Sequence, residues 1–475
     1  MASDTQQTPY GPVPSSLSGG RLGDLCLTDG VQTGPFGSQL HQEDYVSIGI
    51  PIITVEHLGD NRVVHQDLPR VSDEDRQRLA KYSLKTGDIV FSRVGSVDRR
   101  AIVREAENGW LFSGRCLRVR PDPEKLDSQW LSYFFGLPAF KQYIRGIAVG
   151  ATMPSINTKI LSDVPIYFPT LTEQRSAAKC LASIDEKIDI NRRINQTLEA
   201  MAQTIFKSWF VDFVPVKAKI AAKQEGRNPL RAAMSAISGK SDLELDVLPH
   251  EQYDPLAATA ALFPDEMEEL ALGGIPRGWA FQSTETLAEV GIGKTPPRKE
   301  PQWFTECEGD WRWVSIKDMG ASGVFQQRSS EFLTSEAVSR FNVRVVPDRI
   351  VLLSFKLTIG RVAITDGPMV TNEAIAHFKL PSDAAISSEY LYLYLKGFDY
   401  STLGSTSSIA DAVNSKTIRE MPIIVANRDL IHRFSKSVAP LFGEIRNRQN
   451  EIASLSATRD ALLPKLLSGE IEVPA

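Results

Sequence analysis

Two long segments of the chain repeat apolar residues every three or four positions. From Ala177 to Trp209 these positions alternate in steps of four and three, and a second run over 438–466 repeats the pattern. This seven-residue period predicts two helices whose apolar seams pack together. Asn191, Asn195 and Arg448 interrupt the seams, and buried polar residues of this kind fix register and partner choice. The central seam positions are Leu181, Ile184, Ile188, Asn191, Asn195, Leu198, Leu441, Ile445, Arg448, Ile452 and Leu455.

The stretches outside these helices mix short β-type runs with helical patterns. Strands are predicted over 48–55, 88–91 and 101–103, and one helix over 128–144, where Leu131, Phe134, Phe135 and Phe140 form an apolar face. Mixed strands with a few helices indicate an α+β fold.

This arrangement of a globular part and a long helix occurs twice along the chain. Asn157-Thr158-Lys159, followed by Pro165, recurs as Asn414-Ser415-Lys416 and Pro422, 257 positions later. Phe91-Ser92 and Ala101-Ile102 recur at nearly the same distance as Leu353-Ser354 and Ala363-Ile364. A tandem duplication of this kind predicts internal pseudo-twofold symmetry, with two globular parts that are each followed by a long helix.

A chain of 475 residues is expected to form more than one core. The predicted parts are a disordered tail (1–19), a first globular part (20–169), a first long helix (170–215), a linker or peripheral insertion (216–273), a second globular part (274–426) and a second long helix (427–475).

The composition favours a soluble protein of the reduced cytoplasm. Apolar residues make up 42% of the chain without a run long enough to span a membrane, and the four cysteines show no metal-binding spacing. The net charge is −5, yet both repeats are locally basic. Residues 85–120 hold eight Lys and Arg against four Asp and Glu, and residues 340–379 hold six against three.

The sequence contains no recognisable catalytic or metal-binding motif. Gly293-Lys294-Thr295 satisfies a permissive phosphate-loop pattern, but Pro296-Pro297 follows where a helix must start. Pro121-Asp122 with Asp185-Glu186-Lys187 imitates a nuclease motif, but the triplet lies on the solvated flank of the first long helix. The adenine-methylating Asn/Asp-Pro-Pro-Tyr/Phe motif is absent, and the six histidines are dispersed.

The remaining candidates for a functional site are arginine and lysine residues in loops. Arginine suits bidentate contact with guanine and phosphate, and loops between strands can enter a DNA groove. For each residue taken alone, a solvated surface charge is an equally good interpretation. The candidate DNA-binding residues are Arg93, Arg99, Arg100, Arg115, Lys294, Arg298, Lys317, Lys356 and Arg361.

Four segments carry a family resemblance. Two are Thr33-Gly34-Pro35-Phe36-Gly37-Ser38 and Ile292-Gly293-Lys294-Thr295-Pro296-Pro297-Arg298, and the others are residues 173–213, ending in Phe206-Lys207-Ser208-Trp209-Phe210-Val211-Asp212-Phe213, and residues 459–470. With them nearly the whole chain resembles a specificity (S) subunit of a type I restriction-modification system. The first two segments resemble openings of target recognition domains, the third resembles the family's central repeat, and the fourth its C-terminal repeat.

The resemblance implies that each globular part reads one half of a bipartite double-stranded DNA target. It implies that the helices pair as an antiparallel spacer and dock two methylation (M) subunits, with restriction (R) subunits completing the complex. S-adenosylmethionine, ATP and Mg²⁺ would then belong to the partners, and this chain would bind no cofactor. A helix over 172–201 would be about 45 Å long, enough to hold two readers one DNA turn of about 34 Å apart.

Two alternatives stay open. The chain could be a specificity module within a fused methyltransferase or nuclease, or a coiled-coil scaffold without a DNA role. Methyl transfer by the chain alone would favour the first alternative. DNA binding without sequence preference and without salt dependence would favour the second.

Overall fold

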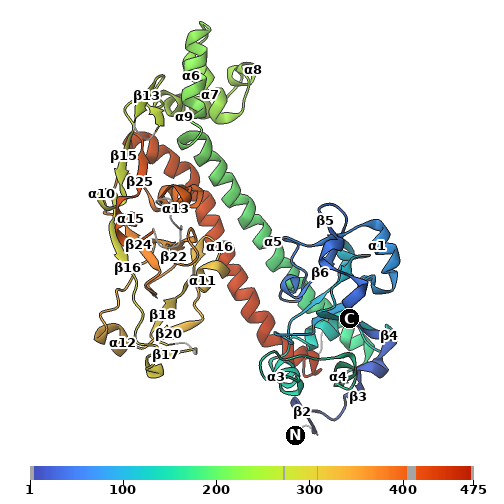
Figure 1. Cartoon of the computed structure of the whole chain (residues 1–475). Coiled ribbons are helices and arrows are strands. Elements are labelled where there is room, and N and C mark those ends of the chain that lie inside the picture. Colours follow the sequence, from blue (N-terminus) through green and yellow to red (C-terminus); the bar gives the residue numbers. More distant parts are fainter. Residues whose placement is uncertain (1–4, 271–272, 307–308, 404–412, 472–475) are drawn as a thin grey trace. The chain divides into compact units, whose positions relative to one another are not determined.

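The computed structural model describes residues 5–270, 273–306, 309–403 and 413–471 and divides into two compact units. Unit 1 comprises residues 1–189 and 453–475, and unit 2 comprises residues 190–452. Each unit has a globular part and contains a stretch of both long helices, α5 (Leu171–Phe210) and α16 (Arg428–Leu467), which are drawn in green and red in Figure 1. The prediction of two mixed α/β parts and two long helices is confirmed.

Unit 1 is built on two four-stranded sheets. The first is fully antiparallel, in the order β4 (Cys26–Thr33), β11 (Cys116–Pro121), β8 (Ile89–Ser92) and β9 (Arg100–Ile102). The second has the order β10 (Leu111–Phe112), β6 (Ile50–Ile53), β7 (Arg70–Val71) and β5 (Tyr45–Val46), with β10 parallel to β6. Its short helices are α1 (Asp73–Arg78), α2 (Ser128–Phe134), α3 (Pro138–Ile147) and α4 (Thr158–Ser162).

Unit 2 repeats this topology strand for strand. Its first sheet has the order β16 (Glu289–Ile292), β24 (Ile375–Lys379), β21 (Val351–Ser354), β22 (Val362–Thr365) and β19 (Phe325–Gln326), so that it gains one edge strand. Its second sheet has the order β17 (Phe304–Thr305), β20 (Glu331–Leu333), β18 (Trp311–Val314) and β23 (Val370–Thr371), with β23 parallel to β18. The accompanying helices are α10 (Thr284–Leu287), α11 (Ile316–Ala321), α12 (Ser335–Arg340), α13 (Ser388–Gly397) and α15 (Ser415–Glu420).

Each globular part is joined to its long helix in the same way. In unit 1, β3 (Ser18–Arg21) pairs with β12 (Pro165–Phe168), and α5 follows β12. In unit 2, β15 (Ala280–Ser283) pairs with β25 (Pro422–Val425), and α16 follows β25. Both long helices contain 40 residues, so the duplication extends through their full length.

Aromatic packing closes the core on which each long helix rests. In unit 1, Phe91 of β8 packs on Phe135 with ring centroids 4.8 Å apart, inside a cluster that includes Leu181 of α5 and Leu466 of α16. In unit 2, Phe210 of α5 packs on Tyr390 of α13 at 4.9 Å. Burial of such side chains stabilises by about 1.5–3 kcal/mol each.

The long helices pair antiparallel within each unit. In unit 2, Asn191 of α5 bonds Arg448 of α16, while Trp209 of α5 packs on Phe434 of α16. Later residues of α5 therefore contact earlier residues of α16, so the two helices run in opposite directions. In unit 1, Asp185 of α5 accepts a bond from Arg459 of α16 at 2.9 Å. The antiparallel pairing that the sequence predicts is therefore present in both units.

The predicted disordered tail is wrong for residues 5–19. These residues form a hairpin of β1 (Thr5–Thr8) and β2 (Gly11–Pro14), followed by β3. Tyr10 anchors the hairpin, because its hydroxyl donates to the Pro165 carbonyl at 2.6 Å and its ring packs on Phe134. The equivalent hairpin in unit 2 is β13 (Met267–Leu270) with β14 (Gly273–Pro276), so the repeat starts earlier than predicted. Residues 1–4 lie outside the described ranges.

The helix predicted over 128–144 is two helices. α2 ends at Phe134 and α3 starts at Pro138, and Leu137 between them is extended with ψ 137°. Proline forces the preceding residue out of the α region and favours the first helical position, so the break follows from Pro138.

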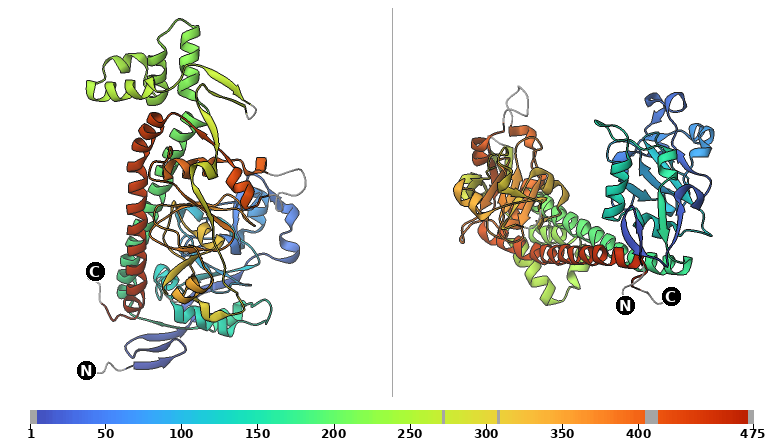
Figure 2. Two further views of the ribbon diagram at one scale, coloured as in Figure 1. Left: turned by 90° about the vertical axis from the view of Figure 1, so that its left-hand side faces the viewer. Right: turned by 90° about the horizontal axis from the view of Figure 1, so that it is seen from below.

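The segment predicted as a linker or insertion folds as a helical insertion. It contains α6 (Val214–Gln224), α7 (Pro229–Ser238), α8 (Asp242–Asp246) and α9 (His250–Ala261), which group together at the end of α5 (Figures 1 and 2). Ala233, Met234, Leu245 and Ala260 form its own small core.

Candidate nucleic-acid interface

Each unit carries a hairpin whose loop is held by the same backbone bonds. We call residues 93–98, between β8 and β9, tip 1, and residues 355–360, between β21 and β22, tip 2. Ser92 N–H donates to the Arg99 carbonyl at 2.9 Å, and Ser354 N–H donates to the Arg361 carbonyl at 2.9 Å. The two serine hydroxyls also donate into their own loops, to Val94 and Thr358. The framework of the two tips is thus shared.

A glycine-containing loop lies beside each tip. Gly34 N–H donates to the Cys116 carbonyl at 3.2 Å, and Gly293 N–H donates to the Ile375 carbonyl at 3.1 Å. A Cβ at Gly34 would lie 2.3 Å from the Ser113 carbonyl oxygen, and one at Gly293 would lie 2.1 Å from that of Asn372. Only glycine permits this close backbone approach. The two motifs that resemble domain openings therefore occupy equivalent positions, and no helix follows Gly293, so it is not a phosphate loop.

Tip 1 gathers two arginines and an exposed aromatic ring. Arg93 N–H donates to the Arg115 carbonyl at 2.8 Å, which brings the two residues together. The Arg93 guanidinium donates to the Gly114 carbonyl at 3.2 Å and lies 5.9 Å from the centre of the Phe36 ring, which is 58% exposed. Arg115 is exposed. This surface is cationic and partly apolar, which suits contact with phosphates and bases.

Tip 2 is flanked by lysines in place of arginines and ends in an apolar side chain. Lys294, Lys317 and Lys356 are exposed. Leu357 is 98% exposed and has φ 62°, whereas the equivalent residue in tip 1 is Gly95 with φ 75°. A left-handed conformation costs a non-glycine residue about 1–2 kcal/mol, and strain of this kind concentrates at functional sites.

Three of the predicted arginines have hydrogen-bond partners on backbone carbonyls of their own unit. A guanidinium nitrogen of Arg99 donates to the Leu58 carbonyl, and the equivalent Arg361 donates to the Ile316 carbonyl at 2.6 Å. Arg100 is only 5% exposed, and its Nε donates to the Ser132 carbonyl at 2.9 Å. Burial lowers the pKa of Arg100, although the nearby Asp60 opposes this shift. Arg100 is therefore a structural cation and cannot reach DNA, while Arg99 and Arg361 brace the hairpins.

Arg298 is exposed but already engaged. Its two terminal nitrogens donate to the Glu331 carboxylate at 2.6 and 2.8 Å, and its guanidinium lies 4.2 Å from the Phe304 ring centre. The hydrogen bond to Glu331 raises the pKa of Arg298, and the same bond lowers the pKa of Glu331. An arginine held in this way is less suited to contact DNA than Lys294 or Lys356.

Every predicted seam residue is at least partly buried. Leu181, Ile188, Asn191 and Ile445 are buried, and the other members are half-buried: Ile184, Asn195, Leu198, Leu441, Arg448, Ile452 and Leu455. The Asn191 amide accepts a bond from Arg448 Nη1 and donates one to Glu451, both at 2.9 Å. Asn191 and Arg448 are equivalent positions of the two repeats, 257 residues apart, so their contact marks the centre of an antiparallel pairing.

Sequence reasoning missed several apolar residues near the tips. The sequence singles out Phe36 only as part of a motif and does not single out Leu357. Val149 and Met153 are 62% and 60% exposed, and their loop reaches tip 1 because Gly95 N–H donates to the Pro154 carbonyl at 2.8 Å. No periodicity marks these residues, since the exposure of a single apolar side chain depends on the tertiary fold.

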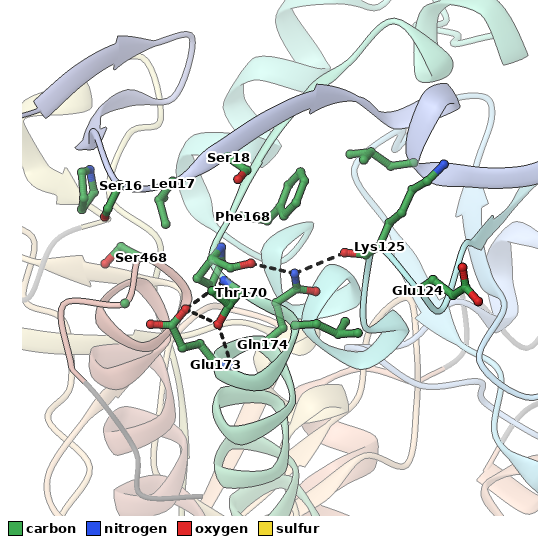
Figure 3. A pocket seen from close by; sticks show the side chains of 15 residues that line it. Ser16, Leu17, Ser18, Glu124, Lys125, Phe168, Thr170, Glu173, Gln174 and Ser468 are labelled. Carbon is green, nitrogen blue, oxygen red and sulfur yellow. Dashed lines mark hydrogen bonds between the residues drawn. The ribbon is translucent and has the colours of Figure 1, made fainter.

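Two cavities in the described part of the chain lie away from the tips, since neither is lined by residues of tip 1 or tip 2. A cavity of about 610 Å³ in unit 1 is lined by Leu17, Lys125, Phe168, Gln174 and Ser468, among others (Figure 3). Gln174 is fully buried and donates to the Pro169 carbonyl at 2.9 Å, and Glu173 accepts bonds from Thr170. These polar groups cap α5 and fix its start. A second cavity, of about 410 Å³ in unit 2, has Phe206, Phe210 and Phe398 among its lining residues.

Within the described ranges, no group of three or more His, Cys, Asp or Glu residues could hold a metal ion. Among the same residues, no helix combines the length and apolar character needed to cross a membrane.

Comparison with known proteins agrees with this geometry. The family described as the type I restriction modification DNA specificity domain matches residues 19–200 and 276–427. The HindI specificity subunit of Haemophilus influenzae is 30% identical over 442 residues, covering 89% of this chain and 95% of that protein. The putative MjaX specificity subunit of Methanocaldococcus jannaschii is 33% identical over 444 residues, covering 90% of this chain and 88% of that protein.

The fold is also that of a solved structure. The type I restriction-modification S subunit from M. genitalium has a TM-score of 0.50 at 15% identity, covering 95% of this chain and 96% of that one. The two matched segments each contain one globular part, and the first also contains residues 171–200 of α5, three quarters of that helix. The chain therefore belongs to the family of type I restriction-modification specificity subunits.

Proposed function

We propose that each globular part binds one half of a bipartite double-stranded DNA target and that tips 1 and 2 carry the sequence specificity. The observation that supports this proposal best is a shared framework with different tips. The same backbone bonds hold both hairpins, while tip 1 reads Arg-Val-Gly-Ser-Val-Asp and tip 2 reads Phe-Lys-Leu-Thr-Ile-Gly. A common scaffold with unlike loops suits two readers of different sequences.

In unit 1, Arg93 and Arg115 are the proposed contact residues. An arginine can donate two bonds to the O6 and N7 acceptors of guanine, or clamp a phosphate. The bonds from Arg93 to the Gly114 carbonyl and to Thr33 at 3.4 Å restrict its side chain before DNA arrives. Such preorganisation lowers the entropy cost of binding.

In unit 2, lysines supply phosphate contacts and Leu357 supplies an apolar one. Lys294, Lys317 and Lys356 are flexible point charges, which favour affinity over base discrimination. Leu357 projects from the tip, and apolar side chains in that position contact thymine methyl groups or wedge between bases.

The long helices are proposed to space the readers and to dock two methylation subunits, with restriction subunits joining the complex. Ile190 and Met201 of α5 are 38% and 49% exposed, so apolar area remains beside the paired seams. In this proposal the chain has no catalytic role. S-adenosylmethionine, ATP and Mg²⁺ act on the partner subunits, and the target adenines are flipped into their pockets.

The test is a genome-wide map of methylated adenines in the host, with and without this gene. We expect one bipartite motif to lose methylation when the gene is removed. A chain in which residues 93–98 are replaced by those of another recognition domain should change only one half of that motif. Persistence of every methylated motif without the gene would overturn the proposal.

A further inference from the structure

One charge pair between a globular part and its long helix occurs at equivalent positions of the two repeats with opposite polarity. In unit 1, Arg104 of the globular part faces Asp189 of α5, with Nη1 and Oδ2 3.5 Å apart. In unit 2, Asp366 of the globular part accepts a bond from Nε of Arg446 on α16 at 2.9 Å. The cation is on the globular part in one unit and on the helix in the other.

These four residues occupy equivalent positions. Val103 N–H donates to the Asp88 carbonyl at 2.8 Å, and Thr365 N–H donates to the Ile350 carbonyl at 2.9 Å. These two backbone bonds are equivalent, and Arg104 and Asp366 are the residues directly after their donors. On the helices, Asp189 and Arg446 are separated by the same 257 positions as Asn191 and Arg448. The same contact is therefore made twice with the charges exchanged.

In both units the carboxylate is the more buried partner. The Asp189 and Asp366 side chains are 14% and 15% exposed, against 52% for Arg104 and 35% for Arg446. Further groups of matching charge support each contact, since Arg62 also pairs with Asp189 and Asp348 lies 3.4 Å from Arg446. Partial burial strengthens a charge pair and makes an unmatched charge costly.

A duplicated chain has a particular problem of assembly. Two globular parts with one topology can dock on either of two similar helices, in one chain or between two copies, and such misassembly is a common failure of repeat proteins. Equal polarity in both repeats would leave the wrong pairing electrostatically as good as the right one. With the polarity exchanged, a wrong pairing places Arg104 against Arg446, or Asp366 against Asp189, and like charges disfavour it.

We propose that Arg104, Asp189, Asp366 and Arg446 are positioning residues that form a charge code, which directs each recognition domain to its own long helix. The code acts together with shape, because α5 presents Ala177 where α16 presents Phe434. The inference concerns how the chain assembles and does not depend on DNA binding.

Four chains of identical composition test the code: the natural chain, a helix exchange (D189R/R446D), a domain exchange (R104D/D366R), and the full exchange of all four residues. We expect each partial exchange to lower Tm by on the order of 5 °C and to speed amide exchange in residues 104–112 and 366–371. The full exchange should recover at least half of that loss, although Arg62 and Asp348 then face like charges.

The matched control is E186K/K436E, which exchanges charges at two exposed positions of the same helices and should leave Tm unchanged. If a reversed chain cannot be purified, a double-mutant cycle of Asp366→Asn and Arg446→Gln measures the coupling, expected at about fivefold in the unfolding constant. A full exchange no more stable than the partial exchanges, a control that loses as much, or a cycle without coupling would overturn the charge code.

Discussion

The two recognition domains carry different side chains at positions where their strands have the same place in the sheet. β9 and β22 occupy the same place in their sheets, yet β9 buries Arg100 where β22 buries Val362. At the tips, Gly95 of one domain is replaced by Leu357 of the other at the same positive φ. The backbone framework tolerates both exchanges because its bonds join main-chain atoms, whose geometry does not depend on the side chains.

This comparison separates two kinds of charged residue. Arg99 and Arg361, whose guanidinium groups bond backbone carbonyls, recur at equivalent positions of the two domains and maintain the hairpins. Residues at the tips do not recur, since Arg93 is matched by Phe355 and Arg115 by Ala374. The recurring set belongs to the scaffold, and the variable set is where two different DNA sequences would be distinguished.

The largest expected effect is on tip 1. Replacing both Arg93 and Arg115 with alanine should weaken binding to the specific target by about 3 kcal/mol, because each bidentate contact contributes about 1–3 kcal/mol. Binding measured by fluorescence anisotropy on the mapped target should fall while Tm stays within a degree. Unchanged affinity would remove these arginines from the interface.

Arg100→Val places the side chain of the second domain in the first. We expect the free energy of unfolding to fall by about 2 kcal/mol, since the Ser132 carbonyl loses its donor and Asp60 loses one cationic partner while Arg459 remains. The dependence of DNA affinity on salt should not change. Chemical denaturation and a salt titration measure the two quantities, and a flattened salt slope would restore Arg100 as a DNA contact.

Leu357→Gly places the residue of the first domain in the second. Relief of the left-handed strain should stabilise the chain by about 1 kcal/mol, while removal of the apolar side chain should weaken specific DNA binding several-fold. Opposite signs for stability and binding are the expected signature of a strained functional residue. A variant that gains stability and keeps full affinity would show that Leu357 makes no contact with DNA.

The smallest effect concerns the lysines of the second domain. Replacing Lys294 and Lys356 with alanine should reduce affinity by less than about 1 kcal/mol per residue and lower the salt slope by about one for each phosphate that is no longer neutralised. Specificity should be retained, because these residues are proposed to bind phosphates. A reduction in affinity that depends on the base sequence would instead assign them to base recognition.

Much of the architecture follows from local patterns in the sequence. The heptad spacing of 177–209 and 438–466 predicts the long helices, and the recurrence at 257 positions predicts the duplication. The hairpin of residues 5–14 was missed because its ten residues bury little apolar surface, and Tyr10 is anchored by Phe134, which lies far along the chain. The split of 128–144 was predictable from Pro138, but the apolar face of that segment outweighed it.

The candidate nucleic-acid interface could be predicted from the sequence only in part. The repeat, the seam residues and the basic loops could be predicted from the sequence, because periodicity and local composition are properties of neighbouring residues. Which basic residues are exposed follows from tertiary contacts. Arg99, Arg100 and Arg361 donate to backbone carbonyls, and Arg93 is half-buried beside the Gly114 carbonyl, whereas Arg115, Lys294, Lys317 and Lys356 are exposed. A buried guanidinium must find hydrogen-bond partners, and those partners come from segments distant in the sequence.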